Sequence, residues 1–291
     1  MRFPISYARS RLFSPASLPA FVRTFYAVSM AHANQLLATH FPSTGPGSNF
    51  TVIAFDIEYT GRKHGDVPIR TMHIPLPRGG SHFLRLLTIA RDGVVIAFDL
   101  LALGAIPPRI VEMFRNPDII KIGVELKGDS VLVIRHYAVP VYNGWELSQL
   151  WKSMHPSIEA APLTSHISVD DMARITLGIR LNKLMQTSDW ATPVLSVEQI
   201  EYALLDAYIL LPIFRVVREE YEQNVWAHFS PSSFAFNVDF AINGVVVPAG
   251  PQTVGSDIHV WGVGNAVPVE AREDWAPSHA ILDGYNAAPY S

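Results

Sequence analysis

Hydrophobic and polar positions along this chain divide it into three parts. Residues 1–48 close on a linker-like run, PSTGPGSN, and short apolar, β-branched runs then alternate with amphipathic segments to about residue 224. Gly, Pro, Val and Asn dominate 225–291. Short apolar runs bounded by turn residues are typical of strands, and longer runs with apolar positions three and four apart are typical of helices. The pattern predicts one α/β unit over 49–224, with poorly structured N- and C-terminal extensions.

Turn and cap residues set the bounds of the predicted elements. The predicted strands are 50–57, 82–90, 94–98, 118–124 and 139–142. The predicted helices are 108–114, 127–136, 146–154, 168–177 and a long one over 196–223. A long loop is expected over 60–81, and the Asn-Gly turn in NVDFAINGVVVP predicts a small hairpin ahead of a disordered tail. Strands that precede helices in this way indicate an α/β core with a mixed sheet flanked by helices.

Composition excludes several classes of protein. The chain has 291 residues and no cysteine, which rules out disulfides, thiolate zinc sites and cysteine nucleophiles. Its formal net charge is −4, so contact with nucleic acid requires a local basic patch. No apolar run reaches membrane-spanning length, because Asp99 and Asp206 interrupt the two most apolar stretches. No membrane partner is therefore expected.

The N-terminal segment has an unusual composition. No acidic residue precedes Asp56, whereas Arg2, Arg9, Arg11 and Arg23 are spread among Ser, Ala and Phe. Arginine-bearing, serine-rich and acid-free segments are typical of mitochondrial transit peptides. Several prolines argue against an amphipathic targeting helix, so a mildly basic arm is the alternative. Nucleus and mitochondrion both stay open as locations.

Four acids and one tyrosine form the candidate site. Asp56 and Glu58 are two residues apart at the end of a predicted strand, so both side chains can point to one face. Tyr202 and Asp206 are four residues apart in a predicted helix and share one of its faces. Asp129 begins a helix that follows a buried strand, a position at which loops deliver functional groups.

This set of oxygen ligands indicates a metal site for phosphodiester cleavage. Without cysteine or nearby histidine, the acids favour Mg²⁺ or Mn²⁺ over zinc. Two such ions, roughly 3.5–4 Å apart, clamp a phosphate and stabilise the attacking and leaving oxygens. Taken singly, an aspartate at a strand end is more often a turn residue, and Tyr202 more often a core aromatic. Asp206 lies inside an apolar helix, where burial without a partner costs several kcal/mol, and the ordered set is therefore much stronger than its members.

The motifs resemble those of the DEDD-type 3′–5′ exonucleases of the tyrosine subclass, from about Phe50 to about Tyr221. FDIEYTG is similar to the first motif, KIGVELKGDSVLV to the second and YALLDAY to the third. The nearest likeness is to the exonuclease domain of the Werner syndrome protein, with ribonuclease D more distant. The resemblance implies a ribonuclease H-like fold. Thr88, where the family has Gln, and Glu125, where relatives often have glycine, depart from the pattern.

The resemblance also implies roles for the site residues. Asp56, Glu58 and Asp206 would bind the tighter of two ions, and Asp56 would bridge to the second ion. Asp129 would hold the water shell of that second ion. Tyr202 would orient the attacking water and help to remove its proton, although a free phenol has a pKa of about 10.

Substrate contacts are expected just after the first motif. The predicted contacts are Ile57, Tyr59, Arg62 and Lys63. Tyr59 would stack on the terminal base, an interaction of roughly 1–3 kcal/mol that tolerates any sequence. Further basic residues would extend a path for phosphates, with a solvated loop as the alternative; they are His64, Arg70, Arg78, Arg85, Arg180 and Lys183.

The expected activity is metal-dependent 3′–5′ hydrolysis of DNA to nucleoside monophosphates. The expected partner is a single-stranded or recessed 3′ end, and no protein partner can be inferred. An exonuclease that processes RNA 3′ ends is one alternative, because contacts to the 2′-hydroxyl cannot be placed. A non-catalytic nucleic-acid-binding member of the fold is the other, although such a protein is expected to have lost at least one of the four acids.

Overall fold

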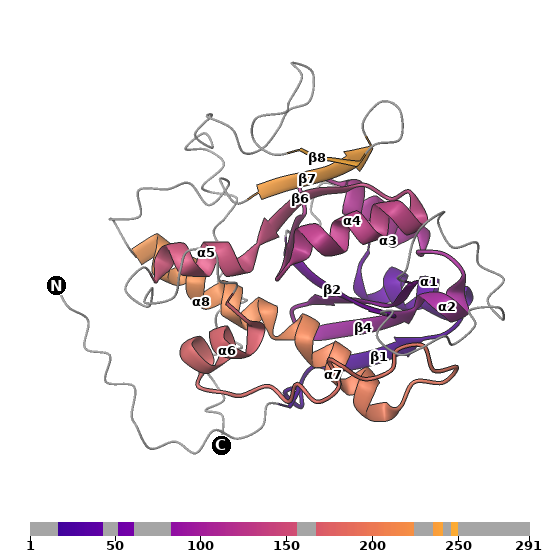
Figure 1. Cartoon of the computed structure of the whole chain (residues 1–291), viewed down its shortest axis with the longest axis horizontal. Helices are drawn as coiled ribbons and strands as arrows, with labels where there is room; N and C mark the ends of the chain where they lie inside the picture. The colour runs from indigo at the N-terminus through magenta and orange to yellow at the C-terminus, as the bar shows by residue number, and fades with distance from the viewer. Residues whose placement is uncertain are drawn as a thin grey trace.

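The described residues form a single mixed sheet flanked by helices (Figure 1). A computed structural model describes residues 17–42, 52–60, 83–155, 167–223, 235–240 and 246–249. Over these ranges the strand order is β1-β4-β3-β2-β5-β6-β7-β8. The strands are β1 (Arg23–Ala27), β2 (Val52–Thr60), β3 (Phe83–Arg91), β4 (Val94–Asp99), β5 (Ile120–Gly123), β6 (Val141–Glu146), β7 (Ala235–Phe240) and β8 (Val246–Ala249). The predicted mixed sheet is thus confirmed.

The helices begin and end largely where local signals place them. Ser168 caps the start of one predicted helix by accepting a hydrogen bond from Asp171 N–H, and Gly178 ends it at φ 73°. The helices are α1 (Met30–His40), α2 (Leu100–Leu103), α3 (Pro108–Arg115), α4 (Leu126–Tyr137), α5 (Leu147–Met154), α6 (Val169–Leu177), α7 (Val197–Tyr208) and α8 (Leu210–Gln223). In the described ranges no helix combines the length and apolar character of a membrane span.

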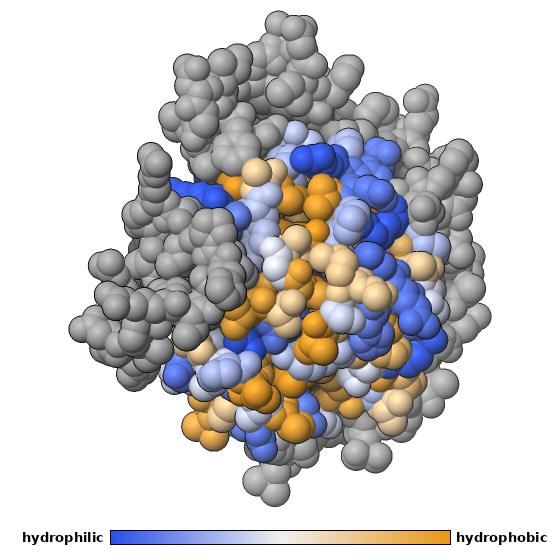
Figure 2. Space-filling view, turned by 90° about the vertical axis from the view of Figure 1, so that its right-hand side faces the viewer, coloured by the Kyte–Doolittle hydropathy of each residue, from blue (hydrophilic) through white to orange (hydrophobic). Residues whose placement is uncertain are grey.

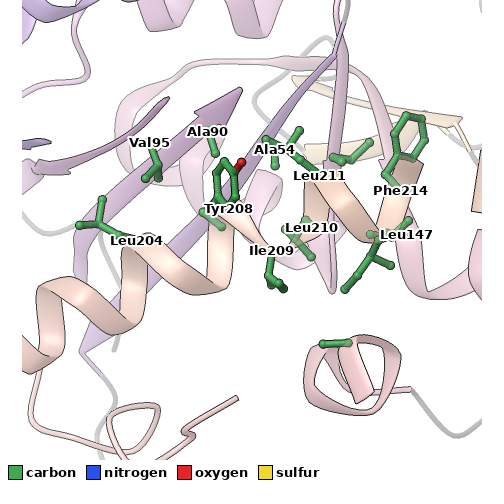
Figure 3. Close-up of a cluster of buried hydrophobic side chains, with 14 of the residues drawn as sticks. Ala54, Ala90, Val95, Leu147, Leu204, Tyr208, Ile209, Leu210, Leu211 and Phe214 are labelled. Atoms are coloured by element: carbon green, nitrogen blue, oxygen red, sulfur yellow. The ribbon is translucent and has the colours of Figure 1, made fainter. Parts of the chain in front are cut away.

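Two hydrophobic cores lie on opposite faces of the sheet. Side chains of α1, α3 and α4 form one core with Ile53, Phe55 and Ile57 of β2. Side chains of α5 to α8 form the other core with Ala54 of β2 and residues of β3 and β4. Figure 3 shows part of this second core, with Tyr208 on α7 directed toward the strands. Because side chains alternate along a strand, every second residue of β2 faces α7.

The pairing of the strands confirms two predicted hairpins. β3 and β4 pair antiparallel, and Gly93 in their connection has φ 72°, a left-handed conformation that favours glycine. β7 and β8 also pair antiparallel. The predicted Asn-Gly turn between β7 and β8 and the predicted loop over 60–81 lie outside the described residues.

The predicted long helix is two helices. α7 ends at Tyr208 and α8 begins at Leu210. Pro212 lacks the N–H that would bond the Tyr208 carbonyl in a continuous helix, and its ring crowds that carbonyl. The prediction of one helix over 196–223 is therefore wrong at Ile209.

Part of the predicted N-terminal arm belongs to the sheet. β1 pairs parallel to β4 at the edge of the sheet, and α1 contributes the fully buried Ala33 and Leu37 to a core. Apolar side chains within this segment pack into the core. The prediction missed them because it relied on the overall composition of 1–48. The arm prediction therefore misses the structure of 17–42, and residues 1–16 lie outside the described residues.

Candidate active site

Strand β2 delivers two of the predicted acids to the face of the sheet that α7 covers. Ile53, Phe55 and Ile57 enter the core on the opposite face, so the alternating Asp56 and Glu58 face α7. Glu58 is buried and Asp56 is partly buried. The predicted common orientation of the two acids therefore agrees with the packing of their neighbours.

Helix α7 brings Tyr202 and Asp206 onto the same face. It packs across β2, β3 and β4, and both side chains are buried. A capping box fixes its start: Ser196 accepts from Gln199 N–H, and the Gln199 side chain accepts from Ser196 N–H at 2.9 Å. The ring of Trp190 lies 6.3 Å from the Tyr202 ring, centre to centre. Tyr202 and Asp206 thus come from an anchored helix rather than from a loop.

An ammonium group lies between these two residues. Lys183 Nζ is 2.9 Å from Oδ2 and 3.2 Å from Oδ1 of Asp206. It also lies 5.5 Å from the centre of the Tyr202 ring, within the range of a cation–π contact. Lys183 therefore belongs to the site itself, not to a peripheral path for phosphates.

The charge of Asp206 raises the pKa of Asp56 and of Glu58, which places these acids within electrostatic range of Asp206. Burial and then the charge of Asp206 raise the pKa of Asp56 from 3.8 to about 7, while Lys183 acts in the opposite direction. Burial, Asp56, Asp206 and Asp129 hold the pKa of Glu58 well above its usual range. This is the behaviour of carboxylates crowded together with too little positive charge.

The fourth acid comes from the first turn of α4. Burial and the charge of Asp56 raise the pKa of Asp129, with smaller contributions from Glu146 and Glu125. Glu125, at the start of the helix, has φ 56°. This left-handed conformation favours glycine, which is the residue that the family pattern has near this position.

Tyr202 is held in its neutral form. Burial raises its pKa, and the charges of Asp206 and Glu58 and a hydrogen bond to Asp206 raise it further. The phenol therefore keeps its proton near neutral pH, and it can donate a hydrogen bond within the acid cluster.

The donor set suits a hard divalent cation in its chemistry. All four acids supply oxygen ligands, which Mg²⁺ and Mn²⁺ prefer. Thr88 lies opposite Asp56 on β3, and its buried hydroxyl has no partner among the described residues. Within those same residues, no three His, Asp or Glu side chains converge closely enough to hold a metal ion. The chemical types and charges of these residues therefore suit a divalent cation. To bind it, the carboxylates would have to move closer together.

The structure corrects one of the predicted phosphate contacts, Arg85, and places the Ile57 side chain away from the acids. The Ile57 side chain belongs to the core on the face away from Asp56, because neighbours along a strand point to opposite faces. Arg85 is buried and pairs with Asp99 at 2.9 Å, so its charge does not line a path for phosphates. Tyr59 is 41% exposed at the end of β2 and stays a prediction.

The other predicted phosphate contacts either lie outside the described residues or form ion pairs within the protein. Arg62 and Lys63 lie outside the described residues, as do His64, Arg70 and Arg78. Arg180 is half exposed and forms an ion pair with Asp170 at 2.7 Å. Among the residues of the predicted path that the structure describes, only Lys183 is brought to the acids.

One contributor was missed by the sequence analysis. Glu146 accepts hydrogen bonds from the N–H groups of Glu125 and Leu126, at the start of the helix that carries Asp129. No motif marks it, because a glutamate at the start of a predicted helix is an ordinary polar residue of a first turn.

Comparisons with known sequences match the part of the chain that carries this site. A family model described as 3′–5′ exonuclease matches residues 46–222. The human exonuclease mut-7 homolog is 27% identical over 161 residues, which are 49% of this chain and 18% of that protein. Human exonuclease 3′–5′ domain-containing protein 2 is 22% identical over 168 residues, 57% of this chain and 25% of that protein. The chain therefore spans a quarter or less of the length of these two relatives.

Solved structures share the fold. The Nibbler exonuclease domain of Aedes aegypti has a TM-score of 0.53 at 20% identity, over 72% of this chain and 91% of that chain. Ribonuclease D of Escherichia coli has a TM-score of 0.50 at 17% identity, over 70% of this chain and 46% of that chain. The predicted ribonuclease H-like fold is confirmed. Because the family model covers well over half of the chain, this protein belongs to the 3′–5′ exonuclease family.

Proposed function

We propose that this protein is a metal-dependent exonuclease of the tyrosine subclass that shortens DNA from its 3′ end and releases nucleoside monophosphates. The observation that carries this proposal is the cluster of Asp56, Glu58 and Asp206 beside Tyr202, in which the charge of Asp206 raises the pKa of both Asp56 and Glu58. Structural acids are rarely left so crowded, because the repulsion costs stability unless a cation offsets it. The likeness of the motifs to the Werner exonuclease domain supports DNA as the substrate.

Different acids would bind the two cations. Asp56, Glu58 and Asp206 would hold one ion, and Asp129 would hold the water shell of the second. Bound there, Mg²⁺ or Mn²⁺ would supply positive charge to the attacked phosphate and acidify the attacking water. Lys183 would release Asp206 and stay close enough to meet the negative charge of the substrate.

Tyr202 would position the water rather than deprotonate it. Its pKa lies above the ordinary value because of burial and the charges of Asp206 and Glu58. A phenol that holds its proton donates a hydrogen bond, which fixes the orientation of the oxygen that it contacts. The expected help in proton removal is therefore the weaker part of its proposed role.

RNA is the second candidate substrate. Escherichia coli ribonuclease D, which shares the fold, is an exoribonuclease involved in structured RNA processing. Surface character does not decide between the two nucleic acids, since hydrophobic and hydrophilic residues are interspersed over the face in Figure 2. For either polymer the proposed partner is a single-stranded or recessed 3′ end, and the proposed location is the nucleus or the mitochondrion.

A cleavage assay tests this proposal directly. The full chain is incubated with 5′-labelled single-stranded DNA, recessed duplex DNA and RNA, in Mg²⁺, Mn²⁺ or EDTA. We expect a ladder of shortened products that needs the cation. Asp56→Asn is expected to lower the rate by about 10²–10³-fold, the usual cost of losing one group that stabilises transition-state charge.

The matched control is an acid outside the cluster. Asp118 is exposed on the turn before β5, so Asp118→Asn should cleave at the wild-type rate. Tight binding of the labelled substrates with no shortening would instead favour a non-catalytic binding protein. Cleavage of RNA but not of DNA would identify RNA as the substrate in place of DNA.

A further inference from the structure

Glu146 connects the end of β6 to the start of the helix that carries Asp129. Its carboxylate accepts hydrogen bonds from Glu125 N–H at 3.0 Å and from Leu126 N–H at 2.9 Å. The Ser148 hydroxyl donates a third bond at 2.7 Å. The side chain is buried. One carboxylate from a neighbouring strand thus takes up two backbone donors at the beginning of α4.

The beginning of α4 needs a partner from outside the helix. Glu125 occupies the capping position in a left-handed conformation, with φ 56°, and its side chain makes no capping hydrogen bond. The turn is also tight, because a Cβ added to Gly123 would lie 2.5 Å from Leu126 Cδ1. The usual solution, a Ser, Thr, Asp or Asn cap, is absent. Glu146 therefore supplies the acceptor that the helix's own sequence lacks.

The position of this turn determines where the Asp129 carboxylate lies. Asp129 is in the first turn of α4, and its N–H bonds the Glu125 carbonyl at 3.3 Å. Side-chain direction in a helix follows the backbone. Any shift of the Glu125 backbone is therefore passed to the carboxylate one turn later.

The charge of Glu146 reaches Asp129 as well. A neutral cap would satisfy the same N–H groups without the cost of a buried carboxylate. Burial raises the pKa of Glu146, and its hydrogen bonds act in the opposite direction. Glu146 is also among the charges that raise the pKa of Asp129. An extra buried negative charge beside Asp129 makes that position more attractive to a cation.

We infer that Glu146 is a positioning residue of the exonuclease site, which fixes the first turn of α4 so that Asp129 is held toward Asp56 and Glu58. The inference rests on the proposed function, since Asp129 is there the acid that serves the second cation. Glu146 itself contacts neither substrate nor cation in this role.

The test compares cation binding in Glu146→Gln and in the wild type. Gln keeps the size of the side chain but places an NH₂ group against one of the two N–H donors. Calorimetric titration of the full chain with Mn²⁺ should show about tenfold weaker binding, the typical effect of removing a partner that orients a metal ligand. Cleavage should fall at low cation concentration and recover in part at saturating cation.

A matched control separates positioning from stability. Ser168 caps α6 by accepting a hydrogen bond from Asp171 N–H, so Ser168→Ala also removes a cap, but from a helix without a site residue. Ser168→Ala should lower the melting temperature and leave Mn²⁺ affinity unchanged. Glu146→Asp, which keeps the charge at shorter reach, should bind Mn²⁺ more tightly than Glu146→Gln.

Two outcomes overturn the inference. One is an unchanged Mn²⁺ affinity in Glu146→Gln, and the other is an equal loss of affinity in Ser168→Ala. With cleavage by the wild type intact, either result rejects the positioning role alone. A wild type that binds Mn²⁺ but cuts no substrate rejects the proposed function alone.

Discussion

Ionisation of Asp56 opposes folding of the metal-free protein at neutral pH. Burial and the charge of Asp206 raise its pKa to about 7, so the folded protein holds the Asp56 proton more tightly than the unfolded chain does. The stabilising contribution of the protonated group is complete below its usual pKa of 3.8 and is lost as the pH rises through about 7. The ionised form destabilises the metal-free fold, and cation binding would reverse that effect.

Asp56→Asn should therefore stabilise the metal-free protein only at higher pH. Asparagine resembles the protonated acid, so the variant and the wild type should be similarly stable at about pH 4. At about pH 8 in EDTA the variant should be more stable by up to a few kcal/mol, because only the wild type has to ionise. Denaturant unfolding at the two pH values measures the difference. An equal effect of the substitution at both pH values would contradict the raised pKa.

At the scale of elements, Arg85 joins β3 to β4 and to the segment before α7. Its guanidinium pairs with Asp99 at 2.9 Å and donates to the Thr192 carbonyl at 2.8 Å and the Pro193 carbonyl at 3.2 Å. Asp99 also accepts a hydrogen bond from the Tyr26 hydroxyl at 2.6 Å. This buried network fixes the entry to the helix that carries Tyr202 and Asp206.

Arg85→Met should lower the free energy of unfolding by about 3–5 kcal/mol, because it leaves the buried Asp99 without its charge partner. Arg218→Met is the control. Arg218 pairs with the half-exposed Glu222 on the surface of α8, and its loss should cost less than about 1 kcal/mol. Denaturant unfolding of both variants tests the difference. Equal losses would show that the Arg85 network contributes no more than a surface ion pair.

Elements with local signals were predictable from the sequence. Ser168 and Gly178 mark the two ends of α6, and Gly93 marks the turn between β3 and β4. Pairing of distant segments was not predictable in this way. β1 pairs with β4 although Arg23 and its partner Val94 lie 71 positions apart in the sequence, and no residue in 1–48 indicates which strand β1 will pair with.

The acids of the site were predictable by type and spacing, and their partners were not. Spacing of two in a strand and four in a helix places Asp56 with Glu58 and Tyr202 with Asp206. Lys183 reaches Asp206 from an irregular segment, where no periodicity fixes the direction of a side chain. Arg85 was predicted as a phosphate contact because it follows the first motif in the sequence. Closeness in sequence does not show whether a side chain is buried.

At the scale of the whole molecule, the folded unit begins before the region that the family model matches. The family model begins at residue 46, yet β1 and α1 precede that residue and complete the sheet. Leu36, Leu37 and Phe41 are buried there, and each such side chain contributes roughly 1.5–3 kcal/mol. Without them the β4 edge and one core would be open to water.

A chain shortened to 46–291 should therefore be unstable or aggregate. The loss of β1 leaves the backbone groups of β4 unpaired, and an open strand edge promotes association between molecules. A chain of 17–291, which keeps β1 and α1, is the control and should melt close to the full chain. Thermal melting with size-exclusion chromatography distinguishes the two. Equal melting of 46–291 and 17–291 would contradict a structural role for the N-terminal segment.

The parallel pairing of β1 with β4 also limits where a protease can cut the N-terminal segment without opening the sheet. A processing protease that removed the acid-free segment as far as its linker would take away an edge strand together with its helix. A cut compatible with the fold has to fall before Leu18, because Leu18 already packs against one of the two cores. The strand that completes the sheet therefore sets a limit on N-terminal processing that the family boundary at residue 46 does not reveal.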